Sequence, residues 1–258
     1  MTIAFNKYQG TGNDFVIIDN RKNLFDPERH DTVKLLCDRR FGIGADGLML
    51  ISGKSGFDFE MKYFNSDGNE SSMCGNGGRC AADFALRHKI AGKDQRFLTI
   101  DGIHEAFISD NKVKLGMNNV ENTAIIDSNY FINTGSPHYI VPVKNVRDTD
   151  VFSEGRKLRY SDKFAPGGTN VNFVELLKDG IFVRTYERGV EDETLSCGTG
   201  VTASAIASVL AGHFVKGDIN VTTPGGKLNI RFKVDGQRIT DIWLTGPATF
   251  VFDGVIEI

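Results

Sequence analysis

This 258-residue sequence contains no run of about 18 consecutive apolar residues, which a membrane-spanning helix would need. Its first stretch, Met1 to Asp19, also lacks the basic start, the uninterrupted apolar run and the small-residue cleavage site of a secretory signal. These absences predict a cytoplasmic protein with no membrane partner. Cysteine is scarce too, and in a reducing compartment the four cysteines are expected as thiols, not as a disulfide framework.

An excess of charge of either sign is also missing. The chain has 30 Lys and Arg residues against 33 Asp and Glu residues, and neither sign forms a long run. It therefore lacks the basic surface that binds nucleic acids or anionic membranes. Hydrophobic residues make up 40% of the chain and 29 residues are glycines, as in a globular protein rich in turns. The expected partner is a small molecule.

What the sequence does contain is an internal repeat. The segment Met73–Gly77 (MCGNG) matches Ser196–Gly200 (SCGTG), at an offset of 123 residues between Cys74 and Cys197. The same offset, without gaps, pairs further residues of the two halves: Thr11 with Thr134, Gly12 with Gly135, Ile17 with Ile140, Phe41 with Phe164, Phe59 with Phe182, Tyr63 with Tyr186, Glu70 with Glu193, Thr99 with Thr222 and Gly102 with Gly225. Each half is long enough to bury its own core, so we predict two pseudo-symmetric domains.

The domain limits are predicted at residues 1–117 and 118–248. The tail Thr249–Ile258 (TFVFDGVIEI) is predicted to form two strands joined by a turn at Asp253 and Gly254. This tail can cross back onto the first domain.

Apolar runs and alternation predict strands over 14–19, 47–51 and 57–64 in the first half, and over 138–143, 170–177 and 181–186 in the second. Helices are expected after each cysteine turn, over 79–89 and 201–211, stopped by Gly92 and Gly212. The second helix lacks a polar face beyond small hydroxyls, so it should be buried. We predict an α/β fold with mixed sheets, in which each domain wraps a barrel-like sheet around one central helix.

Each of the two matched cysteines precedes a glycine-rich entrance to a helix. Glycine leaves backbone N–H groups uncovered, and a helix start carries about half a positive charge. Two such entrances facing each other would hold a substrate carboxylate and the charge that develops when the adjacent carbon loses its proton. The same field lowers the pKa of a nearby thiol. We therefore predict Cys74 and Cys197 as an acid–base pair, against the alternative that each is a small buried hydrophobe at a helix cap.

The remaining cysteines have no counterpart, since the offset places Cys37 opposite Tyr160 and Cys80 opposite Ala203. Both are expected to be packing residues. The spacing of Cys74 and Cys80 is not that of a zinc knuckle, the histidines form no cluster beside a cysteine, and no Cys-x-x-Cys is present. The sequence therefore predicts neither a metal site nor a thioredoxin-like redox pair.

Polar residues at the predicted strand ends form a second group of candidates. Arg188 suits bidentate binding of a carboxylate, Glu187 suits an ammonium group, and Asn65 lies at the equivalent strand end of the first half. The alternative for Glu187 and Arg188 is a surface ion pair. His138, after the opening turn of the second half, is a candidate for tuning thiol protonation, with a satisfied core histidine as the alternative.

Taken together, these motifs resemble diaminopimelate epimerase over nearly the whole chain. The Cys-Gly-x-Gly loop alone would indicate only a wider superfamily of racemases, epimerases and isomerases. The residues that carry the resemblance are Gly12–Phe15 (GNDF), Gly42–Asp46 (GIGAD), Phe64–Gly68 (FNSDG), Cys74–Cys80 (CGNGGRC), Asn170–Val171, Glu187–Gly189 (ERG), Glu193–Thr194, Cys197–Gly200 (CGTG), Pro224–Gly226 (PGG) and Thr245–Pro247 (TGP).

The resemblance implies an isomerase, independent of pyridoxal phosphate and of any other cofactor, that interconverts LL- and meso-2,6-diaminopimelate for lysine and peptidoglycan biosynthesis. It implies a homodimer in the cytoplasm. By similarity, one cysteine is the thiolate base and the other the thiol acid, and His138 and Glu187 modulate them. The implied substrate-binding residues are Gly75, Asn76, Gly198 and Thr199 at the reacting centre, and Asn13, Asn65, Asn170, Glu187 and Arg188 along the substrate.

This chain departs from the family pattern at two positions that contact the distal end of the substrate. Gly47 stands where the family often has Gln, and Ser136 where it often has Asn. Ser136 can still donate a hydrogen bond, whereas at Gly47 water or a neighbouring residue must replace the missing side chain. Neither departure touches the proton-transfer chemistry.

Two alternatives stay open from the sequence alone. A proline or hydroxyproline racemase-like enzyme would share the cysteine loops, although Asn65, Glu187 and Arg188 favour a substrate with a second charged end. A protein that binds amino acids without catalysis, or a thiol-based redox sensor, would also keep both cysteines.

Overall fold

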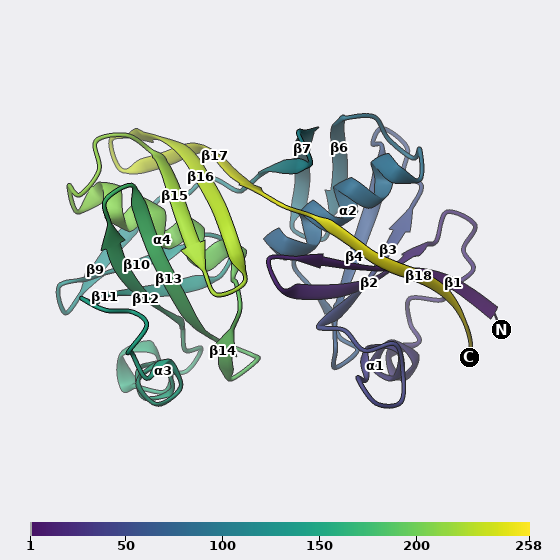
Figure 1. The fold of residues 1–258 in the computed structure, drawn as a ribbon, viewed down its shortest axis with the longest axis horizontal. Coiled ribbons are helices and arrows are strands. Elements are labelled where there is room, and N and C mark those ends of the chain that lie inside the picture. The colour runs from purple at the N-terminus through teal and green to yellow at the C-terminus, as the bar shows by residue number, and fades with distance from the viewer. Residues whose placement is uncertain (1) are drawn as a thin grey trace. The chain divides into compact units, whose positions relative to one another are not determined.

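The computed structural model describes residues 2–258, which form two compact units (Figure 1). The first unit runs to Leu115 and also includes Gly246–Ile258, whereas the second unit is Gly116–Thr245. Each unit has its own mixed sheet and its own buried helix.

The sheet of the first unit is built from nine strands. They are β1 (Thr2–Gly10), β2 (Asn13–Asp19), β3 (Gly47–Ser52), β4 (Phe59–Asn65), β5 (Glu70–Ser71), β6 (Asp94–Thr99), β7 (Gly102–Ser109), β8 (Lys112–Gly116) and β18 (Thr249–Glu257). The pairing runs from β18 through β1, β2 and β3 to β4, which pairs with both β5 and β6, and continues to β7 and β8. Of these pairs, β2–β3 and β4–β6 are parallel.

The sheet of the second unit has the same plan. Its strands are β9 (Thr123–Ile126), β10 (Asn129–Asn133), β11 (Pro137–Pro142), β12 (Asn170–Leu177), β13 (Gly180–Glu187), β14 (Asp192–Thr194), β15 (Asp218–Thr223), β16 (Gly226–Asp235) and β17 (Arg238–Gly246). Here β11–β12 and β13–β15 are parallel, in the places that β2–β3 and β4–β6 take in the first unit. The common pairing order and the two buried helices confirm the predicted fold of two pseudo-symmetric α/β domains.

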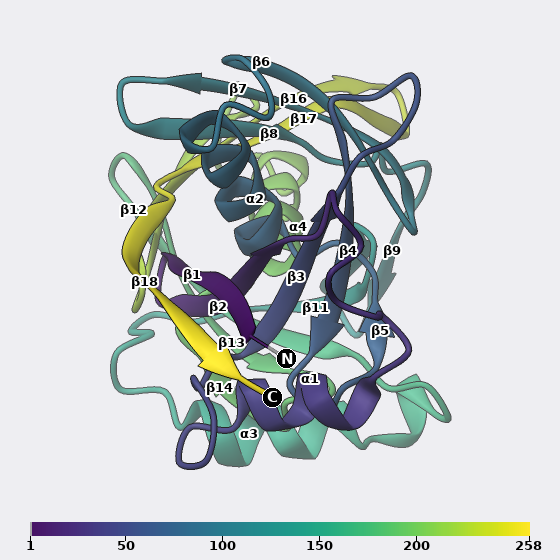
Figure 2. The same cartoon turned by 90° about the vertical axis from the view of Figure 1, so that its right-hand side faces the viewer.

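One helix lies inside each sheet: α2 (Gly75–Arg87) in the first unit and α4 (Gly198–Leu210) in the second. Their bounds differ by the repeat offset of 123 residues at both ends. Figure 2 shows α2 beside the strands of its unit, and it contacts β1, β2, β3, β7 and β18. Nearly all of α4 is buried, as its lack of a polar face predicts.

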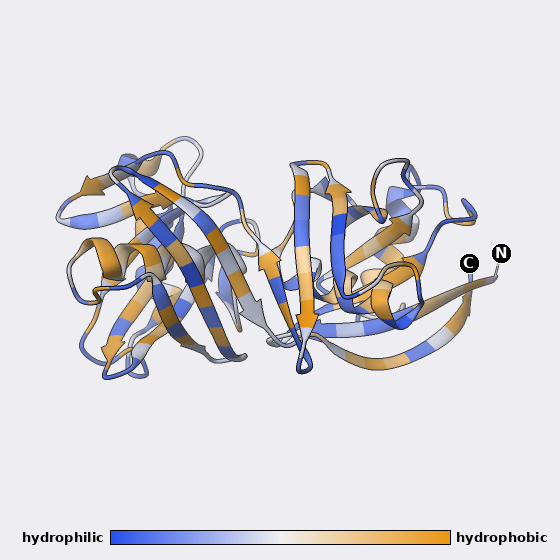
Figure 3. Ribbon diagram, turned by 90° about the horizontal axis from the view of Figure 1, so that it is seen from above, coloured by the Kyte–Doolittle hydropathy of each residue, from blue (hydrophilic) through white to orange (hydrophobic). Residues whose placement is uncertain are grey.

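A second helix covers the outer face of each sheet: α1 (His30–Cys37) in the first unit and α3 (Val151–Arg159) in the second. On α1, Val33 and Leu36 pack with residues of β2, β3 and β4. On α3, Val151 packs with residues of β12 and β13. Because both faces of the central strands are covered, β3 is almost wholly buried, whereas β7 alternates between buried and exposed residues. Such alternation appears as blue and orange bands along strands in Figure 3.

The predicted starts of the two inner helices were wrong. Both helices begin directly after the cysteine, so Cys74 and Cys197 are the N-cap residues and the glycines belong to the first helical turn. The close approach of neighbours explains glycine there, because a Cβ on Gly200 would lie 2.4 Å from Asn172 Oδ1. At the other end, α4 ends at Leu210 and Gly212 follows with a positive φ of 80°, so this glycine stops the helix as predicted. The helix α2 ends at Arg87, and the residue with a positive φ after it is Lys89, at 55°, and not the predicted Gly92.

The tail prediction also needs correction, because β18 is one continuous strand without a turn at Asp253 and Gly254. Gly254 lies opposite Phe5 of β1, and a Cβ there would come within 2.9 Å of the Phe5 ring. The glycine therefore permits close packing inside a strand. Phe250 of the same strand packs edge-on against the buried Tyr8, with ring centroids 5.7 Å apart.

Replacing Phe250 by alanine is expected to lower the free energy of unfolding by about 2–3 kcal/mol, because the half-buried ring packs on Tyr8 and under the Arg87 guanidinium. Val251→Ala is the matched control, since Val251 is exposed on the same strand and should cost about 0.5 kcal/mol or less. Urea unfolding of both variants measures the difference. Equal losses would contradict a packing role for β18.

Candidate active site

Cys74 is fixed at the N-terminus of α2 by the residues on both sides of it. Its backbone carbonyl accepts the N–H of Gly78 at 2.7 Å, and the N–H of Met73 donates to Asp101 Oδ1 at 3.2 Å. Hydrogen bonds hold the Asp101 carboxylate and lower its pKa to about 2, so it stays ionised. Cys74 as a residue is partly exposed, at the positive end of the helix.

Two predicted substrate-binding amides lie beside Cys74. The Cys74 thiol donates to Asn13 Oδ1 at 3.5 Å, and the same oxygen accepts a hydrogen bond from Asn76 Nδ2 at 3.4 Å. Asn13 comes from the start of β2, while Asn76 is a fully buried residue of the first turn of α2. The first unit thus groups a thiol with two amides, one from the first turn of α2 and one from the start of β2.

Asn65 closes β4 and lies opposite Gly47 in the antiparallel pair with β3. Tyr63, on the same face of β4, fills the space beside Gly47, because a Cβ there would lie 2.5 Å from Tyr63 Cε2 and 2.8 Å from Tyr63 Oη. The neighbour expected to replace the missing side chain at position 47 is therefore a tyrosine ring with its hydroxyl.

Cys197 has the equivalent place in the second unit, as the buried N-cap of α4. Its carbonyl accepts the N–H of Val201 at 2.9 Å, and the carbonyl of Leu195 just before it accepts the N–H of Gly225 at 2.9 Å. In each unit, a contact with the turn between two later strands therefore holds the loop that leads to the cysteine.

His138 reaches Cys197 through Thr199. His138 Nε2 lies 2.9 Å from Thr199 Oγ1, which lies 3.4 Å from Cys197 Sγ. On the other side of the ring, Asn172 Nδ2 donates to Nδ1 at 3.1 Å, and Thr185 Oγ1 donates to Asn172 Oδ1 at 2.9 Å. Since Nδ1 accepts, Nε2 carries the hydrogen and donates it to Thr199, whose hydroxyl is then left to donate to the sulfur.

Complete burial lowers the pKa of His138 to about 3, and the nearby charge of Arg188 acts in the same direction. The ring is therefore neutral near pH 7. It orients the Thr199 hydroxyl and adds no positive charge beside Cys197.

Asn170, Arg188 and Ser136 form a second cluster of the same unit. Asn170 accepts the backbone N–H of Arg188 at 2.8 Å and donates to Ser136 Oγ at 2.8 Å. The Arg188 guanidinium donates to the same hydroxyl oxygen at 3.5 Å. Ser136 thus joins the cluster as an acceptor and keeps its own hydrogen to donate. Beside this cluster, Glu187 Oε2 accepts the hydroxyl of Thr194 at 2.8 Å.

The unmatched cysteines are buried, as predicted. Burial raises the pKa of the Cys37 thiol to about 12 and raises that of Cys80 further. Both therefore stay protonated. Across residues 2–258 there is no group of three or more His, Cys, Asp and Glu side chains placed to hold a metal ion. Within the same range, every helix is too short or too polar to cross a bilayer.

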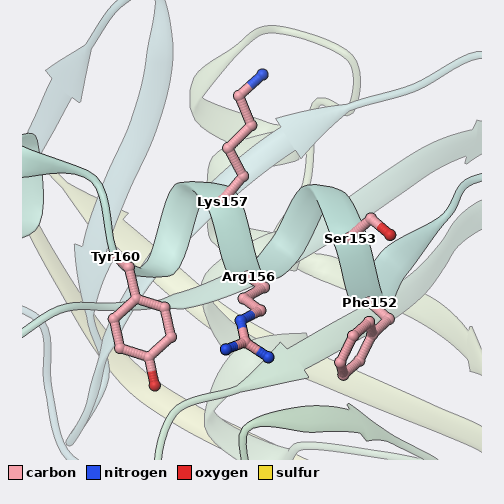
Figure 4. A pocket seen from close by; sticks show the side chains of 5 residues that line it. All are labelled: Phe152, Ser153, Arg156, Lys157 and Tyr160. Atoms are coloured by element: carbon pink, nitrogen blue, oxygen red, sulfur yellow. The ribbon is translucent and has the colours of Figure 1, made fainter.

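A hollow of about 620 Å³ lies along α3, lined by Phe152, Ser153, Arg156, Lys157 and Tyr160 (Figure 4). The lining comes from α3 and from the residue that follows it, and it includes none of the candidate residues. We assign no function to it.

Sequence reasoning missed four residues that hold the candidates in place: Asp46 and Arg79 in the first unit, and Asn172 and Thr185 in the second. For Arg79, Asn172 and Thr185 the available signal was a polar side chain inside a largely apolar strand or helix, whereas Asp46 lies just before β3 and gives no such signal. Asn172 in particular points to the same face of β12 as Asn170.

A pH-dependent contribution from His138 follows from its lowered pKa. Below about pH 6.5 the unfolded chain binds a proton at this histidine and the folded chain does not. The free energy of unfolding should therefore decrease as the pH is lowered, by up to about 1.4 kcal/mol per pH unit. Urea unfolding of the wild type and of His138→Gln between pH 5 and 7 measures this slope. The variant should lack this part of the slope. Identical slopes in the two proteins would show that the pKa of His138 is the same in the folded and unfolded states.

Adding a side chain at Gly47 should destabilise the first unit, because the backbone oxygen of Phe64 lies 2.6 Å from the added Cβ and cannot move freely. Gly47→Ala is expected to lower the free energy of unfolding by about 1–3 kcal/mol. Gly53→Ala, next to the end of the same strand and with nothing within 4 Å of the added atom, is the control. Thermal unfolding compares the two variants, and equal stability would refute the close approach of Phe64 and Tyr63 to position 47.

Comparison with known proteins supports the resemblance. The family model described as diaminopimelate epimerase matches residues 5–122 and 130–251. Diaminopimelate epimerase from Flavobacterium psychrophilum is 50% identical over 252 residues, which cover 97% of this chain and 98% of that protein. The enzyme of the same name from Aquifex aeolicus is 44% identical over 273 residues, covering 98% of this chain and 97% of that protein.

Solved structures of low sequence identity share the fold. A phenazine biosynthesis protein of the PhzF family from Bacillus anthracis has a TM-score of 0.80 at 16% identity, covering 100% of both chains. A hydroxyproline epimerase from Agrobacterium vitis has a TM-score of 0.72 at 15% identity, covering 99% of this chain and 92% of that chain. From the family model and the end-to-end relatives together, this chain belongs to the diaminopimelate epimerase family of isomerases.

Proposed function

We propose that this protein interconverts LL- and meso-2,6-diaminopimelate without a cofactor, and that Cys74 and Cys197 are the acid–base pair. The observation that carries the proposal is the equivalence of the two thiols: each is the N-cap of the buried inner helix of its own unit, at the repeat offset. An epimerase that uses two bases needs two such groups. Membership of the family supplies the substrate.

In the proposed reaction, the thiolate of one cysteine removes the α-proton and becomes a thiol, and the electron pair of the broken C–H bond passes into the adjacent carboxylate. The thiol of the other cysteine then donates its proton to the opposite face of the carbon and becomes a thiolate. The configuration is inverted, the number of protons is unchanged, and the two cysteines have exchanged roles. The reverse reaction starts from that state.

The carbanion formed between these steps needs stabilisation, because no pyridoxal phosphate accepts its electrons. The proposed donors are the N–H groups at the starts of α2 and α4, at Gly75, Asn76, Gly198 and Thr199. Each helix start adds about half a positive charge. These groups are fixed before the reaction, so they stabilise the developing charge without reorganising.

The hydrogen bonds around the cysteines favour different protonation states. At Cys197, the Thr199 hydroxyl is oriented by His138 to donate to sulfur, which favours a thiolate. At Cys74, Asn13 offers a carbonyl oxygen to the sulfur, which favours a thiol. We therefore propose that the thiolate is on Cys197 before substrate binds, and that His138 acts on it through Thr199.

The charged groups along the substrate are proposed to bind Asn13, Asn65, Asn170, Glu187 and Arg188. Arg188 has the fork geometry for a carboxylate, and Ser136 beside it has a hydroxyl hydrogen to donate. Glu187 has the charge for an ammonium group and is the second residue proposed to modulate the cysteines. A cytoplasmic location and a homodimer, which the family resemblance implies, remain part of the proposal.

The test is to replace each cysteine by serine and follow epimerisation of LL-diaminopimelate. Cys74→Ser and Cys197→Ser should each lower kcat by at least about 100-fold, because each removes one proton-transfer group. Cys80→Ala is the matched control: Cys80 lies in α2, the helix that Cys74 caps, its repeat partner is Ala203, and the variant should keep wild-type activity.

Full turnover by either serine variant would reject the cysteine pair. An assay of the wild type on proline and hydroxyproline separates the racemase alternative, and an inactive wild type that binds diaminopimelate would support a binding protein. We expect activity on diaminopimelate alone.

A further inference from the structure

Arg79 is a cation buried without a carboxylate partner. Its side chain is completely buried in α2, and among residues 2–258 it forms no ion pair. It donates to carbonyl and hydroxyl oxygens instead: to Gly75 O at 3.2 Å, Pro247 O at 3.2 Å, Thr11 Oγ1 at 3.3 Å and Asn76 Oδ1 at 3.0 Å. Burying a charge in this way is costly, which points to a role beyond packing.

Asp46 is a charged group of opposite sign. Arg79 contacts Asn76, and Asp46 contacts Asn13, the amide hydrogen-bonded to Asn76. Its Oδ2 accepts Asn13 Nδ2 at 2.5 Å and the backbone N–H of Asp14 at 3.2 Å. Its Oδ1 accepts the Arg39 guanidinium at 2.7 Å, and Arg39 also binds Asp14 through two hydrogen bonds of 2.9 and 2.7 Å. The carboxylate is thus held in place on the side away from Asn13.

These two charged groups leave one orientation for each amide between them. A guanidinium can only donate, so Asn76 must turn its oxygen to Arg79 and its nitrogen to Asn13. An ionised carboxylate can only accept, so Asn13 must turn its nitrogen to Asp46 and its oxygen to Asn76 and Cys74. Reversing either amide would place donor against donor or acceptor against acceptor.

The second unit does not repeat this arrangement. The offset places Thr202 at the position of Arg79 and Thr169 at that of Asp46. Thr202 keeps one of the contacts, since its hydroxyl donates to Gly198 O at 2.9 Å just as Arg79 donates to Gly75 O. The contact between Arg79 and the Asn76 amide is therefore a feature of the first unit and is not needed to build the helix. The Thr11 hydroxyl also donates to Asn76 Oδ1, at 3.3 Å, and is compatible with the same orientation of the amide.

We propose that Asp46 and Arg79 are positioning residues, which fix the orientation of the Asn13 and Asn76 amides beside Cys74. The inference rests on the proposed function, in which these amides bind substrate. The two amides then lie in one fixed arrangement beside Cys74 before substrate arrives. Without a charged group at either end, the amides could reverse, and only part of the enzyme would be ready to bind.

The test replaces Asp46 by asparagine, which has the same shape but can either donate or accept. Asp46→Asn should lower kcat/KM for diaminopimelate about tenfold, as expected for one oriented hydrogen-bonding group, mainly through a higher KM. Arg39→Gln is the matched control: it removes three hydrogen bonds of the same cluster but leaves the Asp46 carboxylate on Asn13. It should lower the melting temperature more than Asp46→Asn does and keep kcat/KM within about twofold.

Asp46→Ser serves as a second variant if Asp46→Asn does not fold, because a hydroxyl also donates or accepts, and the same fall in kcat/KM is expected. Wild-type kcat/KM in Asp46→Asn, or an equal fall in Arg39→Gln, would overturn the inference and leave the proposed function intact. An inactive wild type would instead reject the proposed function itself.

Discussion

The placement of a sulfur atom at the N-terminus of a buried helix is the constraint on which the rest of the structure depends. A buried helix is closely packed against the core around it, and this packing also holds its N-cap residue in place. Both inner helices are enclosed in this way by nearly the same order of strands. Each unit buries one helix, and each buried helix holds one cysteine in a fixed position.

The two units hold their thiols by different means. Around Cys74 the orientation of the polar groups comes from full charges, Arg79 at one side and Asp46 at the other. Around Cys197 it comes from a chain of neutral groups that runs from Thr185 through Asn172 and His138 to Thr199. The repeat preserved the backbone and the sulfurs, while the surroundings diverged. Such divergence suits two thiols that start a reaction in different protonation states.

Much of the fold could be predicted because the repeat is visible in the sequence and the strands are apolar. The starts of the helices could not, since glycine inside a first turn looks the same in sequence as glycine in a loop, and only the neighbours of Gly200 distinguish them. The tail was misread for a similar reason, because Gly254 serves close packing on Phe5 and not a turn. At the site, the cysteines and amides follow from motifs, but Arg79 and Asp46 act through contacts between distant segments.

The central claim is that two thiols act on opposite faces of one carbon. The measurement that tests it most directly is the early time course of LL-diaminopimelate epimerisation by the wild type in deuterium oxide. Two separate proton-transfer groups predict that the product carries deuterium at the inverted centre while the recovered substrate stays unlabelled. Deuterium entering substrate and product at the same rate would indicate a single base and contradict the account.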